Sequence, residues 1–210
     1  MADKAMNHLN GHLLCGVELN TTGPNPLEHE LYQISIIPLD RFYKRSKDMN
    51  WLELTVVPGR YDNIVNGRDA FGAKKAVDSG IDYESAMMIF DHWWNSFDFA
   101  YKKGIAPLSH NWPTKERFLR KWMGDLNFES KFAHDEMRDI ESIMRFLNDL
   151  QDSRCEKFMI NKAKRAYMAY QLGVYRNYGR ERTATAKAAI DIDIYRGLQG
   201  MISQRLLPYG

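Results

Sequence analysis

Short hydrophobic runs near the start of the chain predict three β-strands. The run His12–Glu18 is apolar enough for a buried strand, and Leu31–Leu39 is a second such run that closes at Pro38. Polar and apolar residues alternate over Trp51–Val57, which is the pattern of a half-buried strand. Because turn-forming residues separate the first two runs, we expect the three strands to form an antiparallel meander.

Helical periodicity follows the third strand. Helices are predicted over Asp69–Ser79 and Tyr83–Lys103, and each ends directly before a glycine. The second helix carries a stripe of apolar and aromatic residues that indicates a face packed on the core rather than a platform for stacking bases. The stripe consists of Ala86, Phe90, Trp93, Trp94, Phe97 and Tyr101.

The rest of the chain is predicted to be mostly helical, with two further strands. Strands are expected at Ile105–Ser109 and Lys131–His134, and helices at Pro113–Met123, Met137–Asp152, Glu156–Leu172 and Thr183–Leu206. This order of elements predicts one α/β domain over residues 1–210, with a mixed sheet and a helical C-terminal portion.

Composition is typical of a soluble globular protein, with 44% hydrophobic and 27% charged residues. No run approaches the roughly 18 apolar residues of a membrane helix, and the first residues lack the apolar core of a secretory signal. We therefore expect a cytoplasmic protein. Cys15 and Cys155 lack metal-ligand spacing and are predicted to be reduced thiols in the core.

Charge is distributed unevenly although the net charge is only +2. The stretch Arg154–Lys187 contains nine Lys or Arg and two acids, Glu156 and Glu181. Such a stretch is compatible with phosphate binding or with an ordinary solvated helix face. The charge pattern leaves both interpretations open.

Four segments match known motifs in the same order along the chain. The first is Val17–Gly23 (VELNTTG), with Pro26 and then Leu31–Ile34, and the second is the helix and glycine turn over Asp69–Ile81, followed by Tyr83. The third is Ser109-His110-Asn111 with Arg117-Phe118-Leu119, and the fourth is Tyr170–Val174 with Ala186–Asp191.

Together these segments resemble the DEDD-type 3′–5′ exonucleases. The Arg138-Asp139-Ile140 stretch between the last two motifs makes the phage DexA-like members look most similar. The resemblance implies a ribonuclease-H-like fold, with a mixed five-stranded sheet flanked by helices. It also implies two divalent ions held by four carboxylates, with a histidine as general base in one branch of the family.

Carried over to this sequence, the family's site residues are largely replaced. The first-motif Asp is Glu18 and the first-motif Glu is Asn20, while the second-motif Asp falls at Lys115. The third-motif His falls at Ala186, and only the third-motif Asp is kept, as Asp191. Glu18 and Asp191 are thus the remaining candidate metal ligands, for a weak or empty site.

Lys115 has the largest effect on the expected chemistry. A unit charge pair 4 Å apart is worth roughly 4 kcal/mol at an effective dielectric near 20, and repulsion of a divalent ion is about twice that. We expect the ammonium group to replace the cation and neutralise the remaining carboxylates. A slipped register would make Glu116 the second-motif acid, but the position of Phe118 argues against it.

Two further alternatives concern the third motif and the base. His134 and Asp139 also show the spacing of the third motif, but they follow Lys115 too closely and lack the Leu-Gly-Val lead-in. Without a histidine at position 186, His110 and Tyr178 are candidate bases that no further feature supports. A cleft with Glu18, Glu116, Asp191 and Asp193 is compatible with one weakly held metal ion.

The sequence therefore predicts a catalytically inactive, exonuclease-like phage protein that binds a host protein or a nucleic-acid complex. No cofactor is expected. The alternative is a divergent exonuclease that uses Mg²⁺ or Mn²⁺ to degrade single-stranded DNA or RNA. Candidate nucleic-acid contacts lie in a basic, aromatic stretch: Tyr175, Arg176, Tyr178, Arg180, Arg182 and Lys187.

Overall fold

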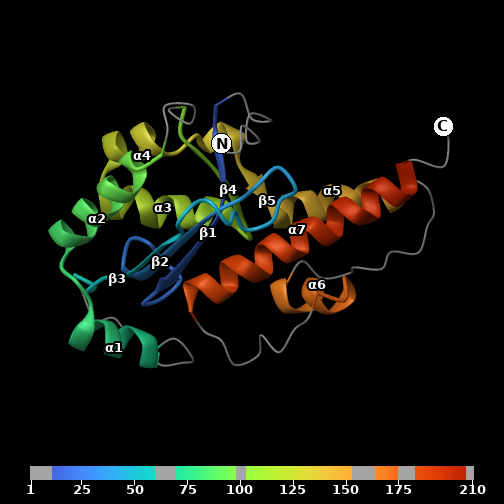
Figure 1. Cartoon of the computed structure of the whole chain (residues 1–210). Helices are drawn as coiled ribbons and strands as arrows, with labels where there is room; N and C mark the ends of the chain where they lie inside the picture. Colours follow the sequence, from blue (N-terminus) through green and yellow to red (C-terminus); the bar gives the residue numbers. More distant parts are fainter. Residues whose placement is uncertain (1–10, 60–69, 98–102, 153–163, 175–182, 207–210) are drawn as a thin grey trace.

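A five-stranded sheet in the order β3-β2-β1-β4-β5 forms the centre of the molecule (Figure 1). The computed structural model describes residues 11–59, 70–97, 103–152, 164–174 and 183–206. The predicted mixed five-stranded sheet, flanked by helices, is confirmed.

The sheet combines an antiparallel half with a parallel half. β1 (Leu13–Thr21), β2 (Leu31–Pro38) and β3 (Leu52–Thr55) form the expected antiparallel meander. β4 (Ile105–Ser109) pairs in parallel with β1, and β5 (Arg138–Asp139) pairs in parallel with β4. β1 is thus the central strand, with an antiparallel neighbour on one side and a parallel neighbour on the other, and it extends three residues beyond the predicted Glu18.

Helices cover both faces of the sheet. One set packs on the face of the sheet formed by Leu13, Cys15, Val17 and Leu19: α2 (Tyr83–Asn95), α3 (Trp112–Met123) and α4 (Asp125–Lys131). The other set packs on the opposite face: α5 (Ile140–Asp152), α6 (Arg165–Gln171) and α7 (Ala184–Leu206). Helix α1 (Ala70–Ser79) contacts β2, where its Gly72 lies against Tyr32.

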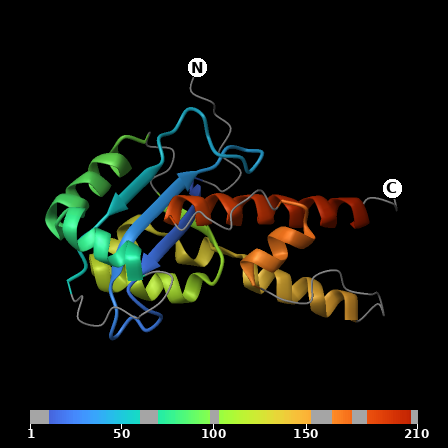
Figure 2. The same ribbon diagram turned by 90° about the horizontal axis from the view of Figure 1, so that it is seen from below.

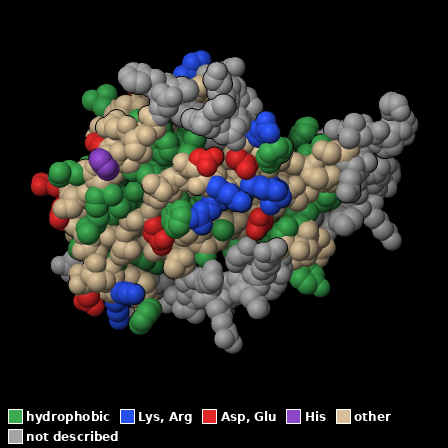
Figure 3. Space-filling view, viewed as in Figure 1, with side chains coloured by type: hydrophobic (Ala, Val, Ile, Leu, Met, Phe, Trp, Pro, Cys, Tyr) green, Lys and Arg blue, Asp and Glu red, His purple; other side chains and the backbone are tan. Residues whose placement is uncertain are grey.

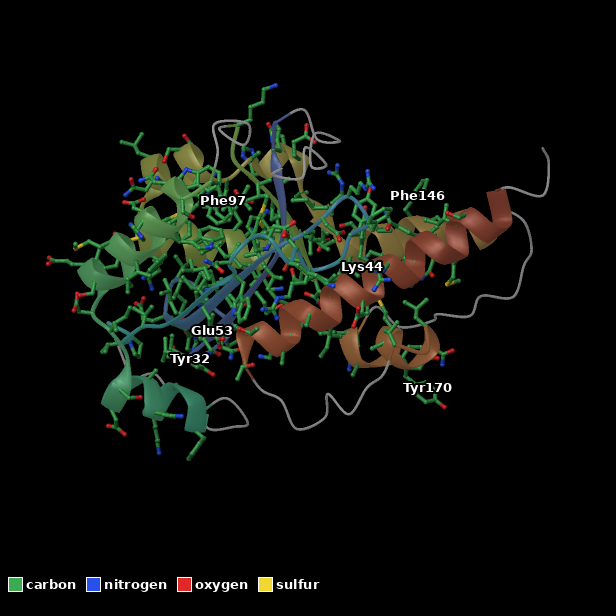
Figure 4. All side chains as sticks on the ribbon, viewed as in Figure 1. Tyr32, Lys44, Glu53, Phe97, Phe146 and Tyr170 are labelled. Carbon is green, nitrogen blue, oxygen red and sulfur yellow. The ribbon has the colours of Figure 1, made fainter. Side chains whose placement is uncertain are left out.

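The C-terminal helices project beyond the sheet. Figure 2 shows α5, α6 and the second half of α7 extending together past the end of the strands. Phe146 on α5 and Tyr170 on α6 are exposed and are labelled on this part of the molecule in Figure 4. No helix in the described part of the chain is both long and apolar enough to cross a membrane.

Gly16 allows α7 to lie directly on β1. A Cβ atom at this position would come within 2.7 Å of Ile192 Cδ1 and 2.8 Å of Ile192 Cγ1. Alternation along β1 puts Leu14, Gly16, Glu18 and Asn20 on the same face of the sheet. The face on which α7 packs therefore carries both Glu18 and Asn20.

The predicted fifth strand at Lys131–His134 is wrong. Lys131 ends helix α4, Phe132 makes only an isolated bridge to Ile105, and His134 begins a short 3₁₀ helix. The fifth strand is instead β5, the two residues Arg138 and Asp139. Phe128 is buried against the aromatic rings of Trp112 and Phe132, and this packing favours a helix where the short apolar run suggested a strand.

Helix α2 is shorter than the predicted Tyr83–Lys103. It ends at Asn95 because Ser96 caps it, with its N–H and hydroxyl groups bonded to carbonyls of the last turn. The expected core stripe is confirmed for Ala86, Phe90 and Trp93, which are buried. Tyr101 lies outside the described residues.

The other predicted helices are confirmed, with shifted ends, where the structure describes them. α5 begins at Ile140 because the Asp139 carboxylate accepts bonds from the N–H and hydroxyl of Ser142. Of the predicted helix Glu156–Leu172, the described part is α6, and residues 153–163 lie outside the described residues. Cys15 is a buried free thiol as expected, and burial raises its pKa; Cys155 is outside the described part.

Candidate functional site

Two buried carboxylates meet where α7 crosses β1. Glu18 lies in the second half of β1 and is 3% exposed, while Asp191 on α7 is fully buried. The close packing at Gly16 places this part of α7 against the strand. Burying two acidic groups is costly unless each is paired and hydrogen-bonded, so their partners decide what the site can do.

Lys115 is the first partner, and it reaches the carboxylates from α3. Its Nζ atom donates to Glu18 Oε2 at 2.8 Å, to Ser109 Oγ at 2.6 Å and to the carbonyl oxygen of His110. Ser109 in turn donates to the carbonyl oxygen of Val17 at 2.6 Å. All three protons of the ammonium group thus have acceptors, and Lys115 is 8% exposed.

Arg165 is the second partner, and it bridges both carboxylates from the first turn of α6. Its Nε atom donates to Asp191 Oδ1 at 2.6 Å and its Nη2 atom to Asp191 Oδ2 at 3.1 Å. The same Nη2 also donates to Glu18 Oε2. The backbone N–H of His110 completes the surroundings of Asp191, with 3.0 Å to Oδ2.

The pKa of Asp191 follows from this balance of burial and charge. Burial alone would raise it, but the positive charges of Arg165 and Lys115 and the Arg165 hydrogen bonds outweigh burial and lower it. For Arg165, burial lowers the pKa, and the charges of Asp191 and Glu18 reverse this so that the net shift is upward. The arrangement therefore keeps Asp191 ionised and Arg165 protonated.

Asn20 lies two residues beyond Glu18 and also contacts a cation. Its Oδ1 atom accepts from Lys187 Nζ at 2.6 Å, and its Nδ2 atom donates to Gln33 Oε1 at 2.8 Å. Gln33 Oε1 also accepts the backbone N–H of Ala184 at the start of α7. Among the described residues, these hydrogen bonds connect three cations and two carboxylates, and we call Glu18, Lys115, Arg165, Lys187 and Asp191 the charge cluster.

The other sequence candidates lie outside this cluster or lack a reactive group. Ala186 is buried near the start of α7, and Glu116 pairs with Arg120 at 2.8 Å rather than facing Glu18. Asp193 lies 3.6 Å from Arg196. His110 contributes backbone groups to the cluster, through its carbonyl and its N–H.

The competing third motif at His134 and Asp139 serves a structural purpose. Asp139 accepts the backbone N–H of Trp112 at 3.1 Å and caps α5 through Ser142. His134 lies near Asp135 on the surface. Most of the proposed nucleic-acid loop falls outside the described residues: Tyr175, Arg176, Tyr178, Arg180 and Arg182.

The cluster does not fit a pair of divalent ions. Glu18 Oε2 already accepts from two cations, and both oxygens of Asp191 have donors. Magnesium needs several oxygen ligands in near-octahedral geometry, chiefly carboxylates and water. Within the described residues, no three His, Cys, Asp or Glu side chains gather in a way that would hold a metal.

Arg165 is the site residue that sequence reasoning did not single out. It belongs to the basic stretch Arg154–Lys187, but it occupies no position of the four motifs. Its side chain reaches the cluster only because α6 packs against α7. Its position within the basic stretch was the only signal in the sequence.

Solved exonucleases share this architecture. Exonuclease I from Methylocaldum szegediense aligns with a TM-score of 0.66 and 14% identity, over 90% of this chain and 40% of that chain. E. coli exonuclease I, solved with a dT13 oligonucleotide, aligns with a TM-score of 0.65 and 14% identity, over 94% and 43%. A 3′-exonuclease with 3′-end specific recognition of the histone mRNA stem-loop gives 0.61 and 14%, over 95% and 68%.

The fold is therefore that of the ribonuclease-H-like exonucleases. The chain spans about two fifths of the length of the two exonuclease I structures. No model of a known protein family matches the chain, and no curated protein matches its sequence.

Proposed function

We propose that this chain is a non-catalytic, exonuclease-like protein that binds a partner and does not cut nucleic acid. The observation that carries the proposal is the pairing of Glu18 and Asp191 with Lys115 and Arg165. The cations lie against the same carboxylate oxygens that metal ions would need. Residues 1–210 would act as one exonuclease-like domain.

The chemistry of hydrolysis supports the proposal. A two-metal mechanism stabilises both the attacking and the leaving oxygen, and each ion needs its own carboxylate ligands. Here an ammonium and a guanidinium neutralise the two carboxylates, so little negative charge remains to attract divalent ions. Ala186, at the position of the family's base, cannot accept a proton from water.

The partner is proposed from two sources. The resemblance to phage DexA-like exonucleases suggests a partner in the host cytoplasm, either a host protein or a nucleic-acid complex. The exonuclease I structure with a dT13 oligonucleotide, and the 3′-exonuclease that recognises the histone mRNA stem-loop, favour the nucleic-acid choice. Affinity capture from host lysate, with and without nuclease treatment, separates the two kinds of partner.

A digestion assay tests the loss of catalysis. A single-stranded oligonucleotide labelled at its 5′ end is incubated with the chain in Mg²⁺ and in Mn²⁺, beside the Asp191→Ala variant and an active exonuclease I. We expect the wild-type chain and the variant to leave the strand equally intact. Shortening from the 3′ end by wild type, abolished in Asp191→Ala, would establish the divergent exonuclease instead.

A further inference from the structure

The segment that joins β2 to β3 forms a compact hairpin with its own hydrogen bonds. Asp40 Oδ1 accepts the backbone N–H groups of Phe42 at 2.8 Å and Lys44 at 2.9 Å. The Asp40 N–H donates to the Lys44 carbonyl at 2.8 Å, and Leu39 pairs with Arg45 in an antiparallel bridge. These hydrogen bonds stabilise the turn from within the hairpin itself.

The hairpin is also anchored to helices on both faces of the sheet. The ring of Tyr43 meets the ring of Tyr195 on α7 edge-on, with centroids 5.5 Å apart. At the other end, the indole N–H of Trp93 on α2 donates to the Asn50 carbonyl at 2.8 Å. These contacts make the hairpin a rigid platform, which lowers the entropy lost when a partner binds.

Two aromatic rings on this platform are exposed, and a guanidinium group lies over each. Arg41 lies 4.7 Å from the centroid of Phe42, and Arg45 lies 3.3 Å from a ring centroid of Trp51. Phe42 is 59% exposed and Trp51 is 44% exposed. Nucleic-acid bases stack on aromatic rings and on guanidinium planes, so each pair offers a stacking surface.

The platform is positively charged. Within residues 40–51, Lys44 and Lys47 are exposed in addition to the two arginines, and the acids are Asp40 and Asp48. Asp40 is engaged in the turn. Figure 3 shows Lys and Arg side chains gathered near the middle of the face in view, with Asp or Glu side chains beside them, and Figure 4 labels Lys44 there, by α7.

We propose that this hairpin, residues 40–51, is a binding surface for single-stranded nucleic acid. Phosphates would contact the lysines and arginines, and bases would stack on the Phe42 and Trp51 pairs. An acidic protein surface would pair with the cations but would not stack on the two ring–guanidinium pairs. The inference rests on the proposed function only in naming the partner, because binding here does not depend on the charge cluster.

The base of the hairpin lies a few residues along β1 from Glu18 of the charge cluster. On β1, Cys15 pairs with Pro38 at the base of the hairpin, and Glu18 pairs with Ser35. Three residues of extended strand span roughly 10 Å. The proposed surface is thus near the charge cluster but separate from it, because α7 covers β1 at Gly16 and the carboxylates are buried.

Fluorescence anisotropy with a labelled oligothymidylate in EDTA tests the surface. The variants Arg41→Ala/Arg45→Ala and Phe42→Ala/Trp51→Ala should each weaken binding about tenfold or more, because the first removes two cations and the second removes two stacking rings. The matched control Phe71→Ala/Lys74→Ala/Lys75→Ala removes an exposed ring and two exposed lysines from α1, and should bind like wild type. Affinity should fall steeply as salt is raised.

Tryptophan fluorescence supplies a second readout, because Trp51 is the most exposed of the five tryptophans. Oligothymidylate should quench wild type, and Trp51→Phe should lose most of that quenching. No binding by wild type, or equal loss in the α1 control, would overturn the proposal. Displacement by polyglutamate at equal charge, without quenching, would overturn it in favour of an acidic protein. The assay contains no free metal, so its failure leaves the digestion result unaffected.

Discussion

Asp191 has no exposed surface, so its charge is compensated by the groups around it. Arg165 makes two bonds to it, the His110 N–H makes a third, and Lys115 adds its charge nearby. In such a network the pairs need not add stability over an apolar core, but breaking one pair is expensive. Removing one partner from this network should therefore destabilise the folded chain.

Asp191→Asn should lower the free energy of unfolding by about 3–5 kcal/mol, because it leaves Arg165 buried with one carboxylate instead of two. Urea unfolding followed by circular dichroism measures the change. Glu116→Gln is the matched control, because Glu116 pairs with Arg120 near the surface of α3. That change should cost no more than about 1 kcal/mol. If Asp191→Asn and Glu116→Gln lowered the free energy of unfolding equally, the cluster would not hold α7 in place.

Acid should destabilise the fold through the same residue. Because the pKa of Asp191 is lower in the folded chain, its ionised form stabilises the fold above the unfolded value of roughly 3.9. That stabilisation disappears as the pH falls from this value through the lowered folded pKa. Urea midpoints measured from pH 7 downward should therefore drop more steeply in wild type than in Asp191→Asn. If the urea midpoints of the two proteins fell in parallel with pH, the pKa of Asp191 would not be lowered in the folded chain.

The sequence predicts the place of Lys115 in the charge cluster but not that of Arg165. Lys115 was foreseen because the spacing to Phe118-Leu119 fixed its position within a motif, and the structure brings it to Glu18. Arg165 was not foreseen, because its contact depends on how α6 packs on α7 and not on any local spacing. A tertiary contact between distant segments leaves no periodic trace in a single sequence.

At the scale of elements, the packing of α7 on β1 brings the two carboxylates of the charge cluster together. Gly16 provides the space, because a Cβ atom there would overlap with Ile192. The helix that occupies this space carries Asp191, and the strand carries Glu18. Packing and site formation are therefore coupled through one glycine.

Gly16→Ala should cost about 1–3 kcal/mol in unfolding free energy, as other enlargements in a packed core do. Ile192→Ala alone should also destabilise the chain, by about 2–5 kcal/mol through the cavity that it leaves. The double variant should cost less than the two single costs together, because the new methyl group fills space that Ile192 vacates. Chemical denaturation of all four proteins measures the coupling. Strict additivity would mean that Gly16 does not determine how closely α7 approaches β1.

Element prediction failed where tertiary packing or capping overrode a local pattern. The apolar run Lys131–His134 suggested a strand, yet Phe128 and Phe132 stack with rings 5.0 Å apart and the segment up to Lys131 is helical. The two-residue strand β5 is too short to show alternation. The central strands were found because their hydrophobic runs were long and bounded by turn residues.

For the molecule as a whole, the fold is that of exonucleases, whereas the carboxylates of the site are paired with cations. The architecture is shared with exonucleases that retain only about 14% identity to this chain. A fold does not fix a function, so the side chains at the site carry the argument. Here two cations lie on the carboxylates, and a third lies on the neighbouring amide.

Titration calorimetry with Mn²⁺ on the folded chain tests most directly whether cations have replaced the metals. The account predicts no heat of binding that depends on the charge cluster, so wild type and Asp191→Ala should give the same trace. Circular dichroism must show that the variant is folded under the conditions used. Binding of Mn²⁺ by wild type that is lost in a folded Asp191→Ala would contradict the account.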